Sequence, residues 1–397
     1  MNKLKRLLCL VLCFALLCAA PGAALADGAE AAEPAQQTDA APADAVQIAA
    51  TSAILMDLNT GTVLYEKEAD TVLPPASITK IMTILLVFEA LDSGKISLTD
   101  TVTASAHACS MGGSQIWLKE GEQFTVDELL KATCIKSAND TSVALAEFVS
   151  GSEEAFVAEM NKRAQELGMT NTVFKNASGL DADGHVSTAR DIALMSRELM
   201  KHKDVTKYTT VWMDYLRDGT TQLVNTNKLI NSYDGITGLK TGTTNLAKNC
   251  LSATAERDGL GLVAVVMGCE TSADRFQSAR TLLDYGFAGY EIVTPQVDTS
   301  GLVKAHVAKG VNQYLPLELG EVTGVLVPKG RGGELTQVTE LEGELEAPVA
   351  KGQKVGVVKL YLDDKLVSEI DVLTGMESPR INFLLALQLL LGHIVGI

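Results

Sequence analysis

A serine and a lysine three residues apart, Ser77 and Lys80, form a pair in this sequence that could perform nucleophilic chemistry. Pro74 and Pro75 precede them, and the apolar run 81–88 follows. Because proline is tolerated at a helix start, where its missing N–H would have no partner, we expect Ser77 in the first turn of a helix. Residues three apart share a helix face, which places the amine beside the hydroxyl. The pair therefore has the outline of an activated serine nucleophile.

Two further short motifs follow along the chain. Ser137-x-Asn139 falls between two predicted helices, 122–136 and 140–149, and short polar links between helices can supply polar groups to a site. Lys240-Thr241-Gly242 falls in a stretch where β-branched residues alternate with glycine, which is typical of a strand that a ligand approaches closely. Each motif alone is weak. Ser-x-x-Lys is expected about once by chance in a chain of this length, and an exposed serine beside a solvated lysine gives the same pattern.

Strand-like and helix-like stretches alternate around these motifs. The predicted strands are 49–57, 62–67, 235–243, 250–255 and 260–267, the last two forming a hairpin at Asp258-Gly259, and residues 220–231 are also hairpin-like. The other predicted helices are 77–91, 153–167 with Ser152 as N-cap, one starting at Thr188 with Asp191 as its capping-box partner, and 273–288. Arg275 stands in the first turn of the last helix, where a cation opposes the helix dipole unless an anion balances it.

In this order, the three motifs resemble those of the low-molecular-mass penicillin-binding proteins, most closely the D-alanyl-D-alanine carboxypeptidases. The sequence departs from the β-lactamase form of the second motif at Ala138, where that form has aspartate, and we interpret this side chain as dispensable to the chemistry. The resemblance covers nearly the whole chain. It implies an α+β fold: a penicillin-binding or β-lactamase-like catalytic domain with an antiparallel sheet flanked by helices, then a small all-β domain and a C-terminal membrane helix.

The resemblance also implies a role for each motif residue. Ser77 would attack the carbonyl between the two D-alanines of a peptidoglycan stem peptide and form an acyl-enzyme, which water would then hydrolyse. Lys80 would take the proton of Ser77, and burial and the nearby Lys240 cation would keep Lys80 neutral by lowering its pKa. Ser137 would relay the proton to the leaving amine, and Asn139 would bond the substrate's peptide group and Lys80.

Substrate recognition is implied for a second group of residues. The backbone N–H groups of Ser77 and Thr243 would form the oxyanion hole, and Arg275 would bind the terminal carboxylate that Lys240 and Thr241 face. The full predicted substrate-binding set is Asn139, Lys240, Thr241, Gly242, Thr243 and Arg275. β-Lactams would acylate the serine as inhibitors. The resemblance implies neither a metal nor another cofactor.

The N-terminal residues 1–26 are predicted to be a signal peptide. Lys3, Lys5 and Arg6 precede an apolar run, and Ala24-Leu25-Ala26 is a small-x-small cleavage site. An uncleaved anchor is the alternative. Residues 27–46, rich in Ala, Pro, Gln and acids, are predicted to be a disordered linker. The protein is therefore expected outside the cytoplasm, on the outer face of the cytoplasmic membrane.

Charge and cysteine content limit the remaining possibilities. The whole chain carries −16, and the predicted signal peptide holds three cations and no acid, which leaves −19 for the rest. Such an acidic chain is a poor candidate for binding nucleic acid. The four cysteines beyond the signal peptide are Cys109, Cys134, Cys250 and Cys269, which show no Cys-x-x-Cys pair. Buried free thiols are favoured over a disulfide framework, although the sequence leaves the pairing open.

From residue 47 onward, the chain is predicted to divide into a catalytic domain, 47–291, a β-rich domain, 292–375, and a tail, 376–397. The tail is almost entirely apolar from Arg380 onward, but it is short for a membrane-spanning helix, which needs about 20 residues. We favour a helix that lies in the membrane surface over one packed on the protein itself.

Three rival functions share parts of this pattern. A β-lactamase would carry the same motifs, but its deacylation glutamate usually lies in Glu-x-x-Leu-Asn, a string that this sequence lacks. A Ser-His-Asp hydrolase would need a histidine such as His185, for which a structural bond in its loop is the alternative role. A catalytically silent penicillin-binding scaffold is the third possibility, and the intact Ser77, Lys80 and Lys240 argue against it.

Overall fold

The computed structural model describes residues 46–387 and residue 391. The predicted signal peptide, 1–26, and the predicted linker, 27–46 apart from Val46, lie outside the described residues.

A five-stranded antiparallel sheet is the framework of the part that carries the motifs, with strand order β2-β1-β9-β8-β7. Its strands are β1 (Ser52–Asp57), β2 (Val63–Lys67), β7 (Ile236–Thr244), β8 (Lys248–Arg257) and β9 (Leu260–Cys269). β9 is buried almost throughout, because helices cover both faces of the sheet. Its continuous apolar sequence agrees with burial on both faces. Asp258 and Gly259 both have positive φ, as a tight two-residue turn requires, so the predicted β8–β9 hairpin is confirmed.

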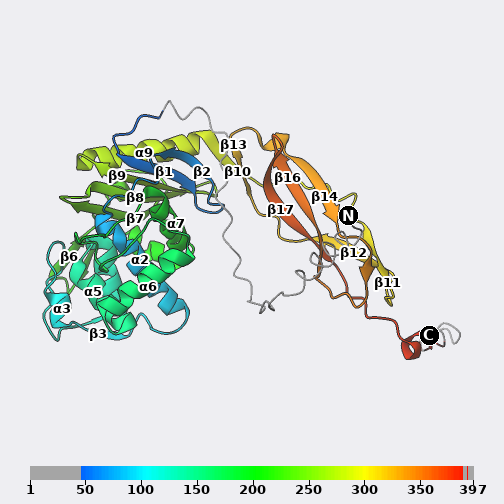
Figure 1. The fold of residues 1–397 in the computed structure, drawn as a ribbon, viewed down its shortest axis with the longest axis horizontal. Helices are drawn as coiled ribbons and strands as arrows, with labels where there is room; N and C mark the ends of the chain where they lie inside the picture. Colours follow the sequence, from blue (N-terminus) through cyan, green and yellow to red (C-terminus); the bar gives the residue numbers. More distant parts are fainter. Residues whose placement is uncertain (1–45, 388–390, 392–397) are drawn as a thin grey trace, which may run out of the picture. The chain divides into compact units, whose positions relative to one another are not determined.

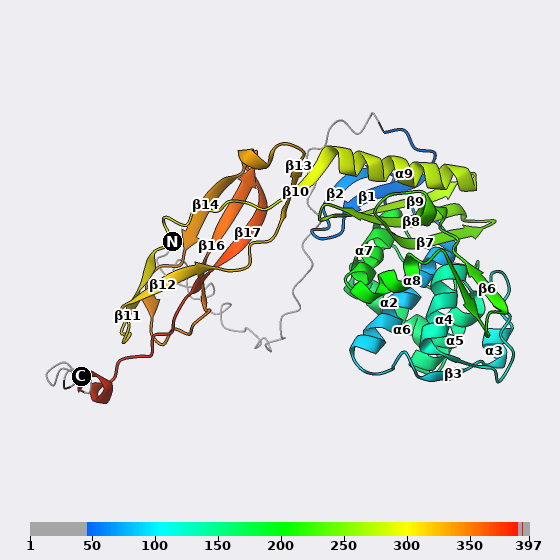
Figure 2. The same cartoon turned by 180° about the vertical axis from the view of Figure 1, so that it is seen from behind.

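Helices lie on both faces of this sheet, as Figure 1 and Figure 2 show from opposite sides. α9 (Ser272–Gly289) packs against β8 and β9, while α7 (Ala189–Met200) packs against β1 and β9 on the other face, and α2 (Lys80–Asp92) packs against α7. α2 is buried on nearly all sides, which explains why its sequence has no polar face. The remaining helices that the structure describes here are α3 (Ala106–Cys109), α4 (Val126–Lys131), α5 (Asn139–Ser150), α6 (Glu153–Glu166), α8 (Thr206–Thr209), η2 (Ala76–Thr79), η3 (Ala132–Lys136), η4 (Lys203–Val205) and η5 (Lys228–Asn231).

The predicted helix 122–136 is wrong over its first residues. Residues Gln123–Thr125 form a strand, β4, that pairs with β3 (Thr101–Thr103). Phe124 is buried between two more exposed neighbours, which is the alternating pattern of a strand and not the pattern of a helix. α4 begins at Val126, where Thr125 and Glu128 form a reciprocal capping box. A single π-helical turn, η3, then replaces the expected end of the α-helix.

Two further predicted elements need correction. The polar hairpin expected at 220–231 lies earlier, as β5 (Met213–Leu216) and β6 (Thr221–Val224), and the 3-10 helix η5 follows it. Thr188 does accept the Asp191 N–H as an N-cap. The Asp191 carboxylate, however, binds Asn171 N–H and the Thr172 hydroxyl instead of completing a capping box, because it joins the helix to a neighbouring loop.

The C-terminal part of the described chain is an all-β domain, as predicted. A six-stranded sheet has the order β14-β16-β17-β12-β11-β15, and β10 (Tyr290–Val293) pairs with β13 (Val325–Pro328). The strands of the larger sheet are β11 (Lys304–Ala308), β12 (Tyr314–Leu319), β14 (Thr336–Leu341), β15 (Leu345–Glu346), β16 (Lys354–Leu362) and β17 (Lys365–Thr374). Alternate valine and leucine side chains of these strands form its core, so its fold follows the period-two pattern of the sequence.

The predicted membrane helix at the C-terminus is described only in part. Residues 383–387 are helical, and Phe383 and Leu384 are exposed, whereas residues 388–390 and 392–397 lie outside the described residues. Within the described part of the chain, the helices all fall short of the length and apolar character that crossing a membrane requires.

The four cysteines beyond the predicted signal peptide are free thiols in the structure. Cys134, Cys250 and Cys269 are buried, as the sequence suggested, and Cys109 is partly exposed. Burial raises the pKa of the Cys134 thiol to about 12 and that of Cys250 to about 11, so both stay protonated near neutral pH.

Candidate active site

Ser77 lies in the short 3-10 helix η2, which continues into α2 at Lys80. The prolines Pro74 and Pro75 precede this turn, so the structure places Ser77 in the first helical turn, as predicted. Lys80 is fully buried, and its Nζ donates a hydrogen bond to Ser77 Oγ over 3.1 Å. The three-residue spacing therefore brings the amine into direct contact with the hydroxyl.

The second motif bridges η3 and α5. Ser137 ends η3 in the left-handed conformation with φ of 61°, Ala138 is the fully buried cap residue, and Asn139 is already the first residue of α5. Such a backbone conformation is unfavourable for serine, and strain of this kind persists where the surroundings fix it. Here it aims two side chains at two lysines. Lys240 Nζ donates to Ser137 Oγ over 2.7 Å, and Lys80 Nζ donates to Asn139 Oδ1 over 2.6 Å.

The two lysines have lowered pKa values. Burial lowers the pKa of Lys80 well below its usual range, the positive charge of Lys240 lowers it further, and the Asp140 carboxylate opposes both effects. Burial is also the main cause that lowers the pKa of Lys240, to about 7. A lowered pKa favours the neutral amine, which can accept a proton, so Lys80 can act as a general base toward Ser77.

A loop that the sequence motifs did not identify completes the surroundings of Lys80. The Ser178 carbonyl oxygen accepts a hydrogen bond from Lys80 Nζ over 2.5 Å. Asn176 shapes this loop, because its Oδ1 accepts the Ser178 hydroxyl and the backbone N–H groups of Ser178 and Gly179. A Cβ on Gly179, which has φ of 81°, would lie 1.9 Å from the Ala76 carbonyl oxygen, so only glycine fits against the nucleophile's turn. The sequence predicted a loop over residues 172–186, with Gly179 among its glycines, but it gave this loop no role at the site.

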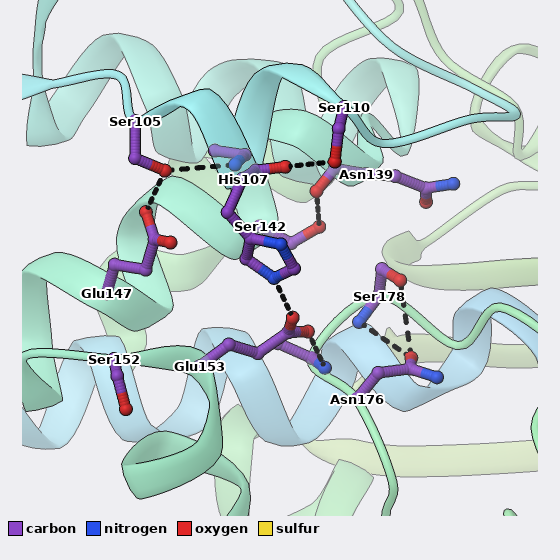
Figure 3. A network of polar contacts seen from close by, with 12 residues as sticks. Ser105, His107, Ser110, Asn139, Ser142, Glu147, Ser152, Glu153, Asn176 and Ser178 are labelled. Carbon is purple, nitrogen blue, oxygen red and sulfur yellow. Dashed lines mark hydrogen bonds and ion pairs between the residues drawn. The ribbon is translucent and has the colours of Figure 1, made fainter.

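A carboxylate anchors the same loop to the protein, as Figure 3 shows. Glu153, the first residue of α6, accepts the Ala177 N–H over 2.9 Å, and its other carboxylate oxygen lies 2.7 Å from His107 Nε2. From the opposite side, Thr83 of α2 donates to the Ala177 carbonyl oxygen over 2.6 Å. Bonds from α6 and α2 thus fix the segment that presents the Ser178 carbonyl to Lys80.

His185 has a structural role in this arrangement. Its Nδ1 accepts the Lys175 N–H, so its Nε2 donates to the Thr79 hydroxyl over 2.8 Å. Burial lowers the pKa of His185 to about 4, which keeps the ring neutral. Because it bonds Thr79 rather than Ser77, a Ser-His-Asp arrangement does not form here, in agreement with the structural role that the sequence left open.

The third motif lies on the edge strand β7, beside the turn that carries Ser77. A Cβ on Gly242 would lie 2.9 Å from the Pro75 carbonyl oxygen and 3.1 Å from Ala76 Cβ, so glycine lets β7 pack closely against η2. The Thr241 hydroxyl donates to Thr226 Oγ1 over 2.7 Å. The strand thus brings Lys240 and its neighbours to the edge of the Ser77 site.

Arg275 reaches β7 from α9. It is almost completely buried, and its Nη1 donates to Thr243 Oγ1 over 2.8 Å and to the Gly242 carbonyl oxygen over 3.0 Å. Arg275 Nε is buried without a hydrogen-bond partner among the described residues. The structure therefore brings together all nine residues predicted from the sequence, namely Ser77, Lys80, Ser137, Asn139, Lys240, Thr241, Gly242, Thr243 and Arg275.

This arrangement suits acyl transfer to a serine from a substrate that carries an anionic group. The Ser77 hydroxyl contacts Lys80, whose pKa is lowered, and Lys240 contacts the Ser137 hydroxyl. Arg275 bonds Thr243 of the neighbouring strand β7. The cations supply the charge that an anionic end requires.

Comparisons with known proteins agree with this chemistry. Residues 35–271 match the family model described as D-alanyl-D-alanine carboxypeptidase, and residues 290–380 match the penicillin-binding protein 5 C-terminal domain. The chain is 43% identical over 347 residues to D-alanyl-D-alanine carboxypeptidase DacF of Bacillus subtilis, covering 86% of this chain and 89% of the relative. It is 38% identical over 343 residues to DacC of Escherichia coli, covering 84% of each.

Solved structures give the same result. Penicillin-binding protein 5 from Haemophilus influenzae is similar with a TM-score of 0.73 and 31% identity, over 84% of this chain and 98% of that one. Penicillin-binding protein D2 from Listeria monocytogenes, solved in its ampicillin-bound form, is similar with a TM-score of 0.56 and 34% identity, over 61% of this chain and 99% of that one.

Proposed function

This chain belongs to the D-alanyl-D-alanine carboxypeptidase family of serine peptidases, and we propose that Ser77 is its acylated nucleophile. The protein is a penicillin-binding D-alanyl-D-alanine carboxypeptidase, which removes the terminal D-alanine of peptidoglycan stem peptides. The observation that carries the assignment of the nucleophile is the 3.1 Å contact between Ser77 Oγ and the buried Nζ of Lys80.

Acylation begins with proton transfer from Ser77 to Lys80. As an ammonium, Lys80 has three N–H groups, and three acceptors face it: Ser77 Oγ, Asn139 Oδ1 and the Ser178 carbonyl oxygen. As a neutral amine it has two N–H groups, which the latter two acceptors can satisfy. Its lone pair then faces Ser77 Oγ and takes the hydroxyl proton as the oxygen attacks the carbonyl carbon.

Expulsion of the terminal D-alanine needs a proton on its amine. Ser137 supplies it, and Lys240, 2.7 Å from Ser137 Oγ, replaces the proton that Ser137 gives up. The backbone N–H groups of Ser77 and Thr243 stabilise the oxyanion, a role that depends on their backbone rather than on their side chains. Water then attacks the acyl-enzyme and gives a proton through Ser137 back to Lys240, and Lys80 returns its proton to Ser77 Oγ as the acyl bond breaks, so the overall reaction is a hydrolysis.

The free chain end is recognised by two cations, Lys240 of β7 and Arg275, which reaches β7 from α9. Lys240 and Arg275 supply positive charge, and the bond from Arg275 Nη1 orients the Thr243 hydroxyl. Thr241 and Gly242 belong to the same stretch of strand, and Gly242 allows the close approach of β7 to the nucleophile's turn. Asn139 binds the substrate's peptide group.

The decisive experiment is mass spectrometry of diacetyl-Lys-D-Ala-D-Ala after incubation with the protein. We expect loss of one D-alanine, no loss with Ser77→Ala, and a covalent penicillin adduct on the parent protein that the variant lacks. Cleavage by Ser77→Ala at the parent rate would refute Ser77 as the nucleophile. Penicillin acylation without peptide turnover would instead indicate a silent penicillin binder.

We also propose that the mature protein acts on the outer face of the cytoplasmic membrane. The cations, apolar run and cleavage site of residues 1–26 support export, and the apolar sequence of residues 380–397 supports attachment as a helix in the membrane surface. Fractionation of cells that express the full chain, with N-terminal sequencing of the mature protein, tests both statements. A protein that starts at Met1 would contradict cleavage.

A further inference from the structure

Trp117 combines an exposed side chain with an unfavourable backbone. The residue is 66% exposed, and its φ is 57°. A bulky residue in the left-handed region is a genuine outlier with an energetic cost. Because the Trp117 ring is exposed to water, hydrophobic burial of the ring does not offset this cost. Such strain persists only where surrounding bonds fix the conformation, and it concentrates at functional sites.

Two charged side chains fix the backbone on both sides of Trp117. The Asp140 carboxylate, which is completely buried, accepts the N–H groups of Ile116 and Leu118, each over 3.1 Å. Arg217 donates to the Ile116 carbonyl oxygen over 2.9 Å and to the Trp117 carbonyl oxygen over 3.3 Å. Arg217 is itself held by Glu122 through bonds of 2.7 and 2.9 Å. The Trp117 ring therefore projects from a rigid turn.

The same turn is joined to the active site. Asp140 directly follows Asn139, whose Nδ2 donates to the Gly112 carbonyl oxygen and whose N–H donates to the Ser114 carbonyl oxygen, each over 2.7 Å. Trp117 is three residues beyond Ser114, which limits the separation of their Cα atoms to about 11 Å. The loop that contacts Asn139 thus also carries the exposed ring.

We propose that Trp117 is a binding platform for the side chain of the residue that precedes D-Ala-D-Ala in the stem peptide. This inference rests on the proposed function, which places the substrate's peptide group against Asn139. A long aliphatic side chain that ends in an ammonium fits the ring, because methylenes pack on its face and the cation is attracted to its π-electrons.

Fluorescence gives a direct test, because the sequence has only two tryptophans, Trp117 and Trp212. In a Ser77→Ala, Trp212→Phe protein, Trp117 is the sole tryptophan and the peptide is not consumed. We expect titration with Nα-acetyl-Lys-D-Ala-D-Ala to change its emission, and Nα-acetyl-Ala-D-Ala-D-Ala to change it far less. No change with the lysine peptide, at concentrations where that peptide blocks penicillin acylation of the parent, would overturn the proposal.

Kinetics provide the second test. Trp117→Ala should lower kcat/KM on the lysine peptide by about 3- to 30-fold and leave the alanine peptide and penicillin acylation unchanged, with Trp117→Phe in between. Trp117→Gly should lose the same discrimination without a lower Tm, because glycine accepts the positive φ. Tyr314→Ala, which removes an exposed aromatic from the β domain, is the matched control.

The outcomes separate this inference from the proposed function. Equal losses on both peptides, or an unchanged lysine preference in Trp117→Ala, would overturn the platform and leave the carboxypeptidase intact. Failure of the parent protein to hydrolyse either peptide would instead contradict the proposed function, while the fluorescence titration would still report whether the side chain contacts Trp117.

Discussion

Lys80 and Ser178 are 98 positions apart in the sequence, yet Lys80 Nζ donates a hydrogen bond of 2.5 Å to the Ser178 carbonyl oxygen. The acceptor is a backbone carbonyl, so the contact does not use the Ser178 side chain. Because a carbonyl dipole stabilises an ammonium, its placement helps to set how readily Lys80 takes and releases a proton. The loop that carries Ser178 therefore belongs to the proposed machinery as much as the motif residues do.

Replacement of Lys80 tests the general base. Lys80→Ala should retain the fold and slow acylation of Ser77 by about 10²–10⁴-fold, since the proton acceptor is lost. The rate of labelling by a fluorescent penicillin measures the effect, and the Tm reports the fold. Lys95→Ala removes an exposed lysine from the turn after α2 and should label at the parent rate. Near-normal labelling of Lys80→Ala would show that another group takes the proton.

The lowered pKa values predict a bell-shaped pH profile of kcat/KM. Lys80 must be neutral, so the rate rises as pH rises through its lowered pKa, whereas Lys240 must be charged, so the rate falls above its pKa of about 7. The two limbs report the coupled pair in the free enzyme. Lys240→Arg stays charged and should move the falling limb to higher pH, although the larger side chain lowers the maximum rate. An unmoved falling limb would assign it to another group.

Asn176 is expected to act on acylation through the loop that it shapes. Asn176→Ala removes the acceptor for two backbone N–H groups and the Ser178 hydroxyl, which releases the carbonyl that binds Lys80. We expect roughly 5-fold slower penicillin acylation, with a shift of the rising limb of its pH profile, since loss of an acceptor worth about 1 kcal/mol changes both. Asn171→Ala, an exposed asparagine in the preceding turn, is the matched control. A lower Tm with an unchanged pH profile would mean a purely structural role.

The sequence predicted local relationships better than distant ones. The contact between Ser77 and Lys80 follows from helical spacing alone. The contact between Ser137 and Lys240 joins residues 103 positions apart, and only the order of the motifs indicated it. The loop that contains Asn176 carries no motif. It acts on Lys80 through the backbone carbonyl of Ser178, and the position of that carbonyl depends on the folded structure and not on a local sequence pattern. The first residues of the predicted helix 122–136 form a strand, since pairing with β3 outweighs local helix propensity there.

The apolar C-terminal tail predicts a separable attachment to membranes. Removal of residues 380–397 should move the mature protein from the membrane fraction to the soluble fraction and leave hydrolysis of a soluble tripeptide unchanged, because all of the proposed site residues lie at or before Arg275. Replacing Phe383 and Leu384, both exposed, by serine should weaken binding to lipid vesicles in part. A truncated protein that stays with the membranes would point to an uncleaved signal peptide or to another attachment surface.

Arg275 provides the sharpest test of chain-end recognition. A carboxypeptidase must read a free carboxylate, and charge-assisted hydrogen bonds to one contribute roughly 1.5–3 kcal/mol. Arg275→Ala should therefore lower kcat/KM on D-Ala-D-Ala peptides by about 10–200-fold, and much less on a peptide whose terminal carboxylate is amidated. Arg275→Lys should recover only part of the activity, because lysine keeps the charge and loses the planar fork, whose Nη1 now bonds Thr243 and Gly242.

The Arg275 comparison needs a control for its burial, since truncating a buried arginine also disturbs the packing between α9 and β7. Arg280→Ala removes a more exposed arginine from the same helix and should leave both peptides unaffected. A loss of Tm in Arg275→Ala with equal loss on the free and amidated peptides would mean that Arg275 only supports the strand. A loss confined to the free carboxylate, at an unchanged Tm, would mean that the guanidinium reads the end of the substrate.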